Sequence, residues 1–230
     1  MSTWIKVARF HLVDRFSYTA LPWGVLAFAL TMSLFLAASA AGSNAQKVPD
    51  FGLAAIYLFF FIIGVQAIGR SLPFALALGV GRRSYYTGTA LLAVSFAAVY
   101  GLALAVLQAI ERATGGWGLD LHFFQVAYIL AGPWYLTWLT SFVLLALMFT
   151  YGMWYGLAYR RWNLPGLLAV SGAQVIAALV MVIVVSQAHA WPAVGRFFTT
   201  LSAAGLTGLL AALAVMLLAG GYATMRRVTV

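Results

Sequence analysis

Apolar residues form six long runs along this 230-residue chain, and short segments between the runs hold nearly all of the charged residues. The runs cover approximately 22–41, 51–70, 87–109, 134–158, 164–185 and 199–222. An α-helix needs roughly 20 apolar residues to cross a hydrocarbon core about 30 Å thick, with every backbone amide bonded inside the helix. Apart from Arg70 at the edge of the second run, none of them contains Asp, Glu, Lys or Arg. The pattern predicts an all-α integral membrane protein with six transmembrane helices.

The basic residues alternate between the segments that join these runs, and the alternation predicts the orientation of the chain. Short segments of membrane proteins retain basic residues on the cytoplasmic side. The two chain ends, with the second and fourth connecting segments, carry ten of them: Lys6, Arg9, Arg15, Arg70, Arg82, Arg83, Arg160, Arg161, Arg226 and Arg227. The remaining segments carry only Lys47, Arg112 and Arg196. We therefore expect both termini on the cytoplasmic side.

The N-terminal arm before the first run mixes apolar and charged side chains. It includes Trp4, Lys6, Arg9 and Arg15, a composition that favours a helix over 3–19 lying in the cytoplasmic membrane interface. A basic arm before an apolar run also resembles a secretory signal peptide. The first run is about 20 residues long, however, whereas the apolar part of a signal peptide is usually about 7–15 residues. We therefore expect the first span to be retained.

Composition agrees with a membrane location. Hydrophobic residues make up 64% of the chain and charged residues 7%, against about a quarter charged in soluble domains. The net charge of +9 falls in short segments rather than on a polar face, so we expect membrane lipids and no nucleic acid as partners. An Arg-, Ala- and Gly-rich chain is typical of a GC-rich bacterial genome, which predicts a multi-pass protein of a bacterial cell membrane. With no repeat or linker visible, we expect one transmembrane domain over 1–230.

The sequence lacks the residues that several kinds of catalytic and metal-binding site require. Neither lysine, Lys6 or Lys47, ends a glycine-rich phosphate-binding loop, and the absence of cysteine excludes thiolate metal sites and cysteine nucleophiles. His11, His122 and His189 fall in three different extramembrane segments, so no metal or haem site is expected. The predicted spans also lack the ionisable groups that ion-coupled transporters place in the membrane. We expect no catalytic residue and no bound cofactor.

Polar but uncharged side chains remain within or beside the predicted spans. They suit either of two roles, a hydrogen bond between helices, which is the commoner one, or the lining of a path for an amphipathic substrate. Five are candidates for such a path: Gln66, Gln108, Thr137, Ser141 and Gln174.

The second cytoplasmic segment has the most distinctive sequence in the chain. Two glycines permit a sharp turn, two arginines supply fixed charge and forked donors, and a serine and two tyrosines lead into the third span. These residues are Gly79, Gly81, Arg82, Arg83, Ser84, Tyr85 and Tyr86. The segment suits two interpretations: a basic cytoplasmic loop with aromatic anchors, or a knuckle that docks into a groove on a soluble partner.

The stretch LALGVGRRSYYTGT, which contains those seven residues, resembles the coupling segment in permease subunits of bacterial ABC-2 type exporters. The six runs, the basic N-terminal arm and the chain length are similar to the same family. The resemblance implies a half-transporter that pairs with a second permease copy and with two separate ATP-binding-cassette subunits, which bind ATP and Mg²⁺. It also implies that the seven residues form the contact with the ATPase and that the arm over 3–19 is the connecting helix. In one departure, the segment over 186–198 is brief for the re-entrant hairpin of some members.

The resemblance predicts a permease subunit that exports a hydrophobic or amphipathic substrate, such as a lipid, a peptide or a drug-like molecule, with energy from a separate ATPase chain. A membrane scaffold or assembly protein without transport activity would have the same composition and topology. A membrane enzyme acting on lipids would need a convergent acid, base or metal cluster, and the sequence contains none.

Overall fold

The computed structural model describes residues 19–40, 53–125, 130 and 132–225, and within these residues the chain folds into helices without any strand. The helical elements are α2 (Leu21–Ala40), α3 (Ala54–Gln66), η2 (Ala67–Ser71), α4 (Leu72–Ala77), α5 (Arg82–Ala113), η3 (Gly116–Asp120), α6 (Trp134–Gln187), α7 (Trp191–Thr200) and α8 (Ala203–Met225). The interfacial helix predicted over 3–19, with Trp4, Lys6, Arg9 and Arg15, lies outside the described residues except at its last position.

Five helices in the described part are long and apolar enough to cross a membrane: α2, the continuous stretch α3–η2–α4, α5, α6 and α8. This confirms the prediction of an all-α chain with several helices of membrane-spanning length. The main difference in bounds concerns α5, which has 32 residues and extends beyond both ends of the apolar run at 87–109. The polar residues at its two ends belong to the helix and not to loops.

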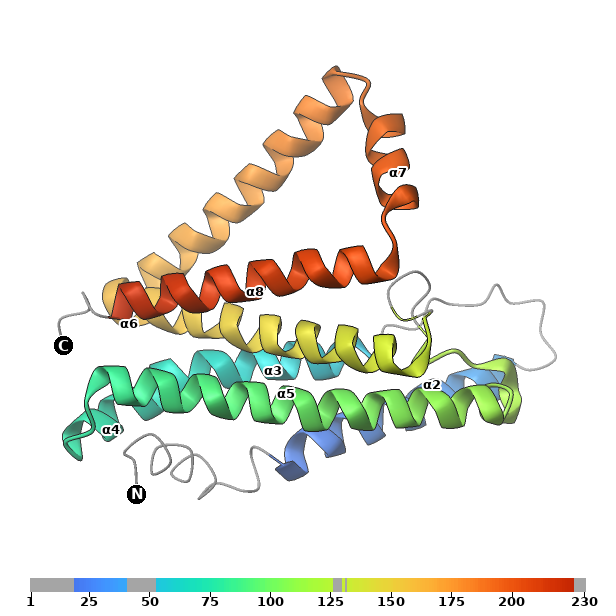
Figure 1. Cartoon of the computed structure of the whole chain (residues 1–230), viewed down its shortest axis with the longest axis horizontal. Helices are drawn as coiled ribbons and strands as arrows, with labels where there is room; N and C mark the ends of the chain where they lie inside the picture. Colours follow the sequence, from blue (N-terminus) through green and yellow to red (C-terminus); the bar gives the residue numbers. More distant parts are fainter. Residues whose placement is uncertain (1–18, 41–52, 126–129, 131, 226–230) are drawn as a thin grey trace.

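The longest helix, α6, is bent. It has 54 residues, and Asn163 within it has φ 54° and ψ −148°, which no helical residue adopts. Pro165 follows two residues later, lacks an N–H and disfavours helical geometry at the residue before it. Figure 1 shows the two arms of α6, 134–162 and 164–187, running in different directions from this bend. The arms contain the predicted fourth and fifth spans, which are therefore two helices that meet at the kink at Asn163.

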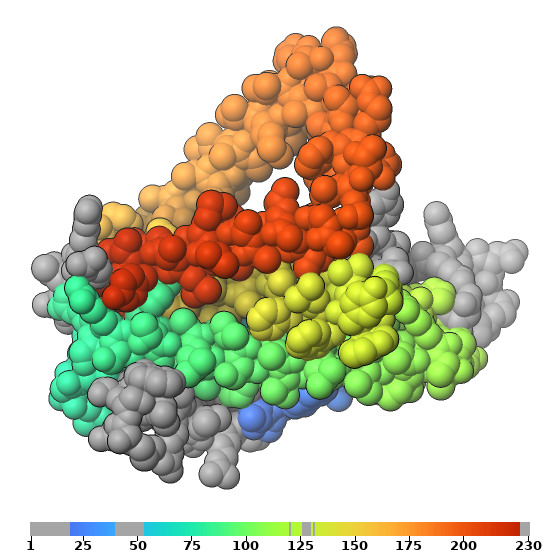
Figure 2. All heavy atoms as spheres, viewed as in Figure 1, coloured from blue at the N-terminus to red at the C-terminus, as the bar shows by residue number. Residues whose placement is uncertain are grey.

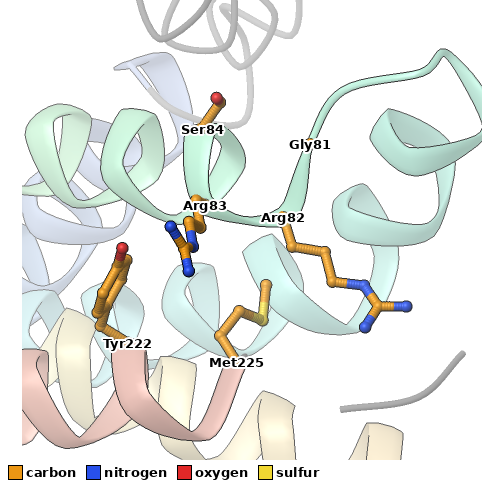
Figure 3. A pocket seen from close by; sticks show the side chains of 6 residues that line it. All are labelled: Gly81, Arg82, Arg83, Ser84, Tyr222 and Met225. Atoms are coloured by element: carbon orange, nitrogen blue, oxygen red, sulfur yellow. The ribbon is translucent and has the colours of Figure 1, made fainter. Parts of the chain in front are cut away.

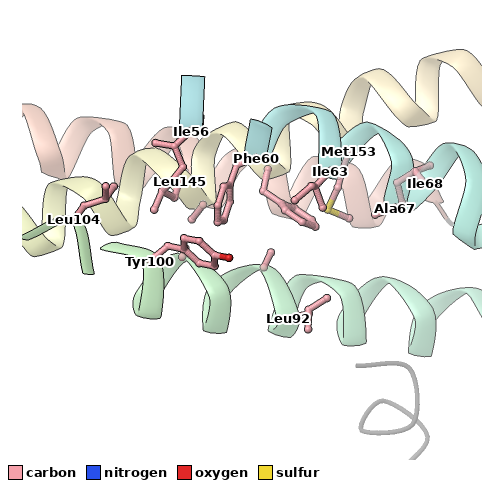
Figure 4. Close-up of a cluster of buried hydrophobic side chains, with 14 of the residues drawn as sticks. Ile56, Phe60, Ile63, Ala67, Ile68, Leu92, Tyr100, Leu104, Leu145 and Met153 are labelled. Atoms are coloured by element: carbon pink, nitrogen blue, oxygen red, sulfur yellow. The ribbon is translucent and has the colours of Figure 1, made fainter. Parts of the chain in front are cut away.

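The core lies between α3, α5 and the first arm of α6, and both α3 and α5 pack along this arm (Figure 1). Glycines allow the backbones of α3 and α6 to touch. A Cβ atom added at Gly64 would collide with the carbonyl oxygen of Phe149, and one added at Gly152 with that of Phe61. Apolar side chains from the three helices fill the space around this contact (Figure 4), among them Ile56, Phe60, Ile63, Leu92, Tyr100, Leu104, Leu145 and Met153.

Helix α8 is attached to the first arm of α6 by polar contacts as well as by packing. The hydroxyl groups of Thr140 and Thr207 are 2.7 Å apart and buried. Nearer the other end of α8, the indole Nε1 of Trp154 donates a hydrogen bond of 2.8 Å to the carbonyl of Leu217. In a membrane the hydrophobic effect does not favour one helix pair over another, because lipid tails are as apolar as the helix surfaces. Hydrogen bonds such as these therefore help to determine which helices pair.

One end of the bundle gathers the short helix α4, the start of α5, the bend of α6 and the end of α8 (Figure 1). Five of the described arginines belong to these segments or to η2, which leads directly into α4: Arg70, Arg82, Arg83, Arg160 and Arg161. Arg112 lies in the last turn of α5, at the opposite end, and Arg196 lies in α7. The arginine-rich connecting segments of the described chain therefore lie at one end of the bundle, and the segments with Arg112 and Arg196 lie elsewhere. We call the first end the arginine end.

The second arm of α6 and α7 project from the bundle. Figure 2 shows an opening between this arm, α7 and α8. Side chains along 175–184 are exposed on every side of the arm, including Val175, Ile176, Leu179 and Met181. The predicted outer segment over 186–198 is occupied mainly by α7, a single helix of 10 residues, so the described chain has one short helix at this place.

Candidate coupling site at the arginine end

The turn that joins α4 to α5 is built on a glycine with a left-handed backbone. Gly79 has φ 79°, and its N–H bonds to the carbonyl of Leu76 while that of Val80 bonds to the carbonyl of Ala75. This pair of bonds is the Schellman arrangement, which ends a helix and satisfies its last carbonyls. The sequence-based prediction of a sharp turn is therefore confirmed at Gly79.

Gly81 has a different role from Gly79. It is the N-cap of α5 with φ −64° and ψ 141°, an extended conformation open to any residue. A Cβ atom added there would meet nothing within 4 Å. Neither backbone geometry nor space requires a glycine, and the absence of a side chain leaves the start of α5 uncovered.

The two tyrosines after the turn face the interior of the bundle. Tyr85 is fully buried, and its hydroxyl donates a hydrogen bond to the carbonyl of Ala67 in η2. Tyr86 is also buried, and its hydroxyl donates a hydrogen bond of 2.8 Å to the carbonyl of Leu218 in α8. These side chains connect the turn to two other helices, and the surface of the predicted contact consists of residues 79–84.

A pocket of about 520 Å³ opens beside this surface (Figure 3). Its lining combines four of the residues predicted from the sequence, at the start of α5, with two residues from the end of α8: Gly81, Arg82, Arg83, Ser84, Tyr222 and Met225. Tyr222 and Met225 were not predicted, because no local pattern marks the end of α8 as a neighbour of the turn. Their rings and chains reach the site only because α8 packs back along the bundle.

The five polar residues of the predicted substrate path are placed in three different settings. Gln66 is exposed on α3, and Gln174 is exposed on the second arm of α6, where its Oε1 accepts hydrogen bonds of 2.6 Å from Tyr151 and Tyr155. Thr137 and Ser141 lie one turn apart on α6, both buried, and their hydroxyls make no hydrogen bond within the described residues.

The fifth residue of that set, Gln108, is buried near the far end of α5. Its Nε2 donates hydrogen bonds to the carbonyls of Phe124 and Leu130, at 3.0 Å and 2.9 Å. Gln108 thus holds the segment that leads back to α6, which is a structural role. Only Thr137 and Ser141 lie next to each other among the predicted path residues.

Glu111, one turn after Gln108, is a buried carboxylate just beyond the predicted third span. It is fully buried, and its Oε2 accepts hydrogen bonds from the indole Nε1 of Trp117 and from the backbone N–H groups of Phe123 and Phe124. Arg112 beside it donates to the carbonyls of Leu130 and Gly132. These contacts fold the segment after η3 over the end of α5. The sequence signal was the charged pair directly after a predicted span.

No group of three or more His, Cys, Asp or Glu side chains that could hold a metal ion occurs among the described residues. Comparison with known proteins adds no further assignment, since no family model, no curated protein and no solved structure matches the chain. The assignment of the site therefore rests on the chemistry and the geometry described above.

Proposed function

We propose that this chain is the permease subunit of an ATP-driven ABC-2 type exporter in a bacterial cell membrane. In this proposal α2, α3, α5, the two arms of α6 and α8 are the six spans. The arginine end faces the cytoplasm, as do both chain termini, and the N-terminal arm is the interfacial connecting helix. The gathering of Arg70, Arg82, Arg83, Arg160 and Arg161 at one end of the bundle supports this orientation.

The observation that carries the proposal is the way the turn at 78–81 is connected to the bundle. Residues 79–84 present an uncovered helix start with two arginines, while the next two residues, Tyr85 and Tyr86, are buried and bonded to η2 and α8. A force applied to the turn is therefore passed to two separate helices within one helical turn. A segment with an exposed basic surface and a buried mechanical link suits contact with a motor subunit.

The mechanism follows from this connection. Two ATP-binding-cassette subunits bind ATP and Mg²⁺, close on each other and displace the turn that docks on them. Tyr85 carries the displacement to η2 and the α3 backbone, and Tyr86 carries it to α8. Because packed helices switch between discrete arrangements rather than bending continuously, a small displacement at the turn changes which side of the bundle is open.

The nature of the substrate is proposed from the surface that surrounds the opening between the second arm of α6 and α8 (Figure 2). The second arm of α6 and α8 expose many large apolar side chains, for example Val180, Ile183, Leu209 and Leu213. A hydrophobic or amphipathic substrate, such as a lipid, a peptide or a drug-like molecule, suits such a surface. The same exposed arm supports the expectation of a second permease copy, which covers apolar surface that the single chain leaves open.

Charge reversal at the turn tests the proposal. The variant Arg82→Glu with Arg83→Glu is expressed together with the ATP-binding-cassette subunit that the proposal requires, and co-purification and ATPase activity are measured. The matched control is Arg160→Glu with Arg161→Glu, which makes the same charge change at the same end but away from the turn. We expect the first variant to insert normally and to lose the ATPase subunit, and the control to retain it. Normal assembly and stimulation in the first variant would exclude the coupling role and leave a scaffold without transport activity.

A further inference from the structure

The pocket between the start of α5 and the end of α8 has a lining suited to an anion. In Figure 3 the guanidinium of Arg83 points toward α8, between Tyr222 and Met225, whereas the side chain of Arg82 extends away from them. The carbonyl of Arg83 accepts a hydrogen bond from the hydroxyl of Thr87, but the guanidinium of Arg83 makes no hydrogen bond and no ion pair within the part of the chain that the structure describes. Two adjacent arginines therefore serve different surfaces, and only Arg83 is directed into the pocket.

Hydrogen-bond donors dominate the pocket. Arg83 offers five N–H groups, and the hydroxyl of Tyr222 has no hydrogen-bond partner among the described residues. The first bond inside α5 runs from the N–H of Tyr85 to the carbonyl of Gly81, so the amides of Arg83 and Ser84 precede it and add to the positive end of the helix dipole. None of the lining residues is acidic.

Among the described residues, no acidic side chain lies at this end of α5. Glu111 is at the opposite end of α5, where its carboxylate accepts a hydrogen bond from the backbone N–H of Phe123. At about 1.5 Å of rise per residue it lies roughly 40 Å from the pocket. The charge of Arg83 therefore awaits an anion from outside the described chain, and the forked guanidinium suits the oxygens of a phosphate group.

The other half of the pocket is apolar. Met225 is buried, and the ring of Tyr222 packs against that of Tyr86 with centroids 5.9 Å apart. The exposed side of α8 that leads toward the pocket is apolar as well, with Val215 and Met216 both more than 60% exposed. A cationic head beside an apolar strip matches a phospholipid, with its phosphate in the pocket and its acyl chains along α8. An acidic peptide would use the charge and leave the strip uncovered.

We propose that this pocket binds the headgroup of an anionic phospholipid from the leaflet at the arginine end. Anionic lipids are the abundant phosphate-bearing partners of basic pockets between helices at the cytoplasmic surface. The bound lipid bridges α5 and α8 beside the hydrogen bond from Tyr86 to Leu218, and so reinforces the joint between the turn and α8. The inference goes beyond the proposed function and does not require the ATPase subunits.

Native mass spectrometry of the purified chain alone, titrated with phosphatidylglycerol, phosphatidylcholine or inorganic phosphate, tests this site. The variants are Arg83→Gln and, as a matched control, Arg160→Gln at the same end but outside the pocket. We expect the wild type to bind phosphatidylglycerol about 10-fold more tightly than phosphatidylcholine. Arg83→Gln loses about 10-fold in that affinity, the effect of one charged hydrogen bond, and Arg160→Gln changes it less than about twofold. Tyr222→Phe provides a second, milder variant if Arg83→Gln proves unstable, and its expected loss is about threefold.

Three results would overturn the proposal. Equal losses in Arg83→Gln and Arg160→Gln would mean general charge attraction without a site. Inorganic phosphate that displaces phosphatidylglycerol at equal concentration would assign the pocket to a free anion. Unchanged lipid binding in Arg83→Gln together with loss of the ATPase subunit would assign the pocket to an acidic protein partner. Because lipid binding is measured on the isolated chain, its failure is distinguishable from failure of the permease proposal.

Discussion

Removing the hydroxyl of Tyr86 is the sharpest perturbation of the link between the turn and α8. In Tyr86→Phe the ring remains against Tyr222, but the hydrogen bond of 2.8 Å to the carbonyl of Leu218 is lost. That carbonyl lies inside α8 and keeps its helical bond, so no buried group is left without a partner. The free energy of unfolding should fall by only about 1 kcal/mol, the usual value of one such bond within a membrane or a protein interior.

The effect on coupling should be much larger than the effect on stability. Under the proposed mechanism, displacement of the turn no longer pulls α8 without this bond, and ATP hydrolysis would proceed without matched transport. We expect the amount of substrate transported per ATP hydrolysed in proteoliposomes to fall several-fold, while co-purification with the ATPase subunit stays normal.

The matched control is Tyr159→Phe, because Tyr159 is exposed and its hydroxyl makes no hydrogen bond within the described residues. It should leave both stability and the transport-to-hydrolysis ratio unchanged. If Tyr86→Phe retains the wild-type ratio although the unfolding measurement shows that the bond has been lost, then Tyr86 does not transmit the movement, and the reasoning is refuted.

Three further predictions concern stability and local order. Gly152→Val should prevent folding or lower the free energy of unfolding, measured reversibly in mixed micelles, by more than about 3 kcal/mol, because the valine side chain collides with the backbone of α3. The control Gly172→Val, with no atom within 4 Å of its added Cβ, should cost below about 1 kcal/mol. Equal losses in the two variants would contradict the close contact. Gly79→Ala should lower the free energy of unfolding by about 1–2 kcal/mol, since φ there is 79°, whereas Gly81→Ala should change it by less than about 0.5 kcal/mol. Equal shifts of the thermal melting curves in the two variants would contradict the left-handed backbone at Gly79. Glu111→Ala removes the acceptor of three hydrogen bonds and should cost about 3 kcal/mol, with hydrogen exchange accelerated at the amides that its carboxylate holds, and unchanged exchange there would exclude the clamp.

The apolar pattern was sufficient to predict the helices but not the form of every connection between them. A basic pair, Arg160 and Arg161, and the Asn163-Leu-Pro165 sequence separate two apolar runs. The structure joins the corresponding two helices by a kink at Asn163, without a longer loop. Hydropathy indicates where an apolar run ends, but it does not show how short the connection to the next helix is.

The buried polar contacts could not be predicted, because they join residues far apart in sequence. Tyr86 and its acceptor Leu218 are 132 residues apart, and nothing near either one marks the other. Glu111 follows the end of an apolar run, where a charged side chain is ordinarily exposed, yet α5 continues past it and the next segment folds back to supply hydrogen-bond donors. The sequence also does not show which glycines lie against a neighbouring helix. Gly152 lies against the backbone of α3, whereas Gly172 has no atom within 4 Å of an added Cβ.

The turn at 78–81 was the most predictable part of the site. The turn is marked by a glycine with positive φ, by the arginines that follow it and by its place before a predicted span. These features depend on neighbouring residues in the sequence and not on distant contacts, so they could be predicted. The pocket beside it required the tertiary structure, because two of its six lining residues come from the end of α8. The sequence could therefore predict the turn and its basic residues but not the pocket beside them.

Contact between the turn and an ATPase subunit is the central claim, and thiol cross-linking tests it most directly. The chain contains no cysteine, so Gly81→Cys introduces a single thiol at an uncrowded position. Thr199→Cys on α7 is the control, because α7 joins α8 at the end away from the turn (Figure 1). The account predicts a cross-link to the ATP-binding-cassette subunit from position 81, strengthened or weakened by ATP, and none from position 199. No cross-link from position 81, or equal cross-linking from both positions, would contradict it.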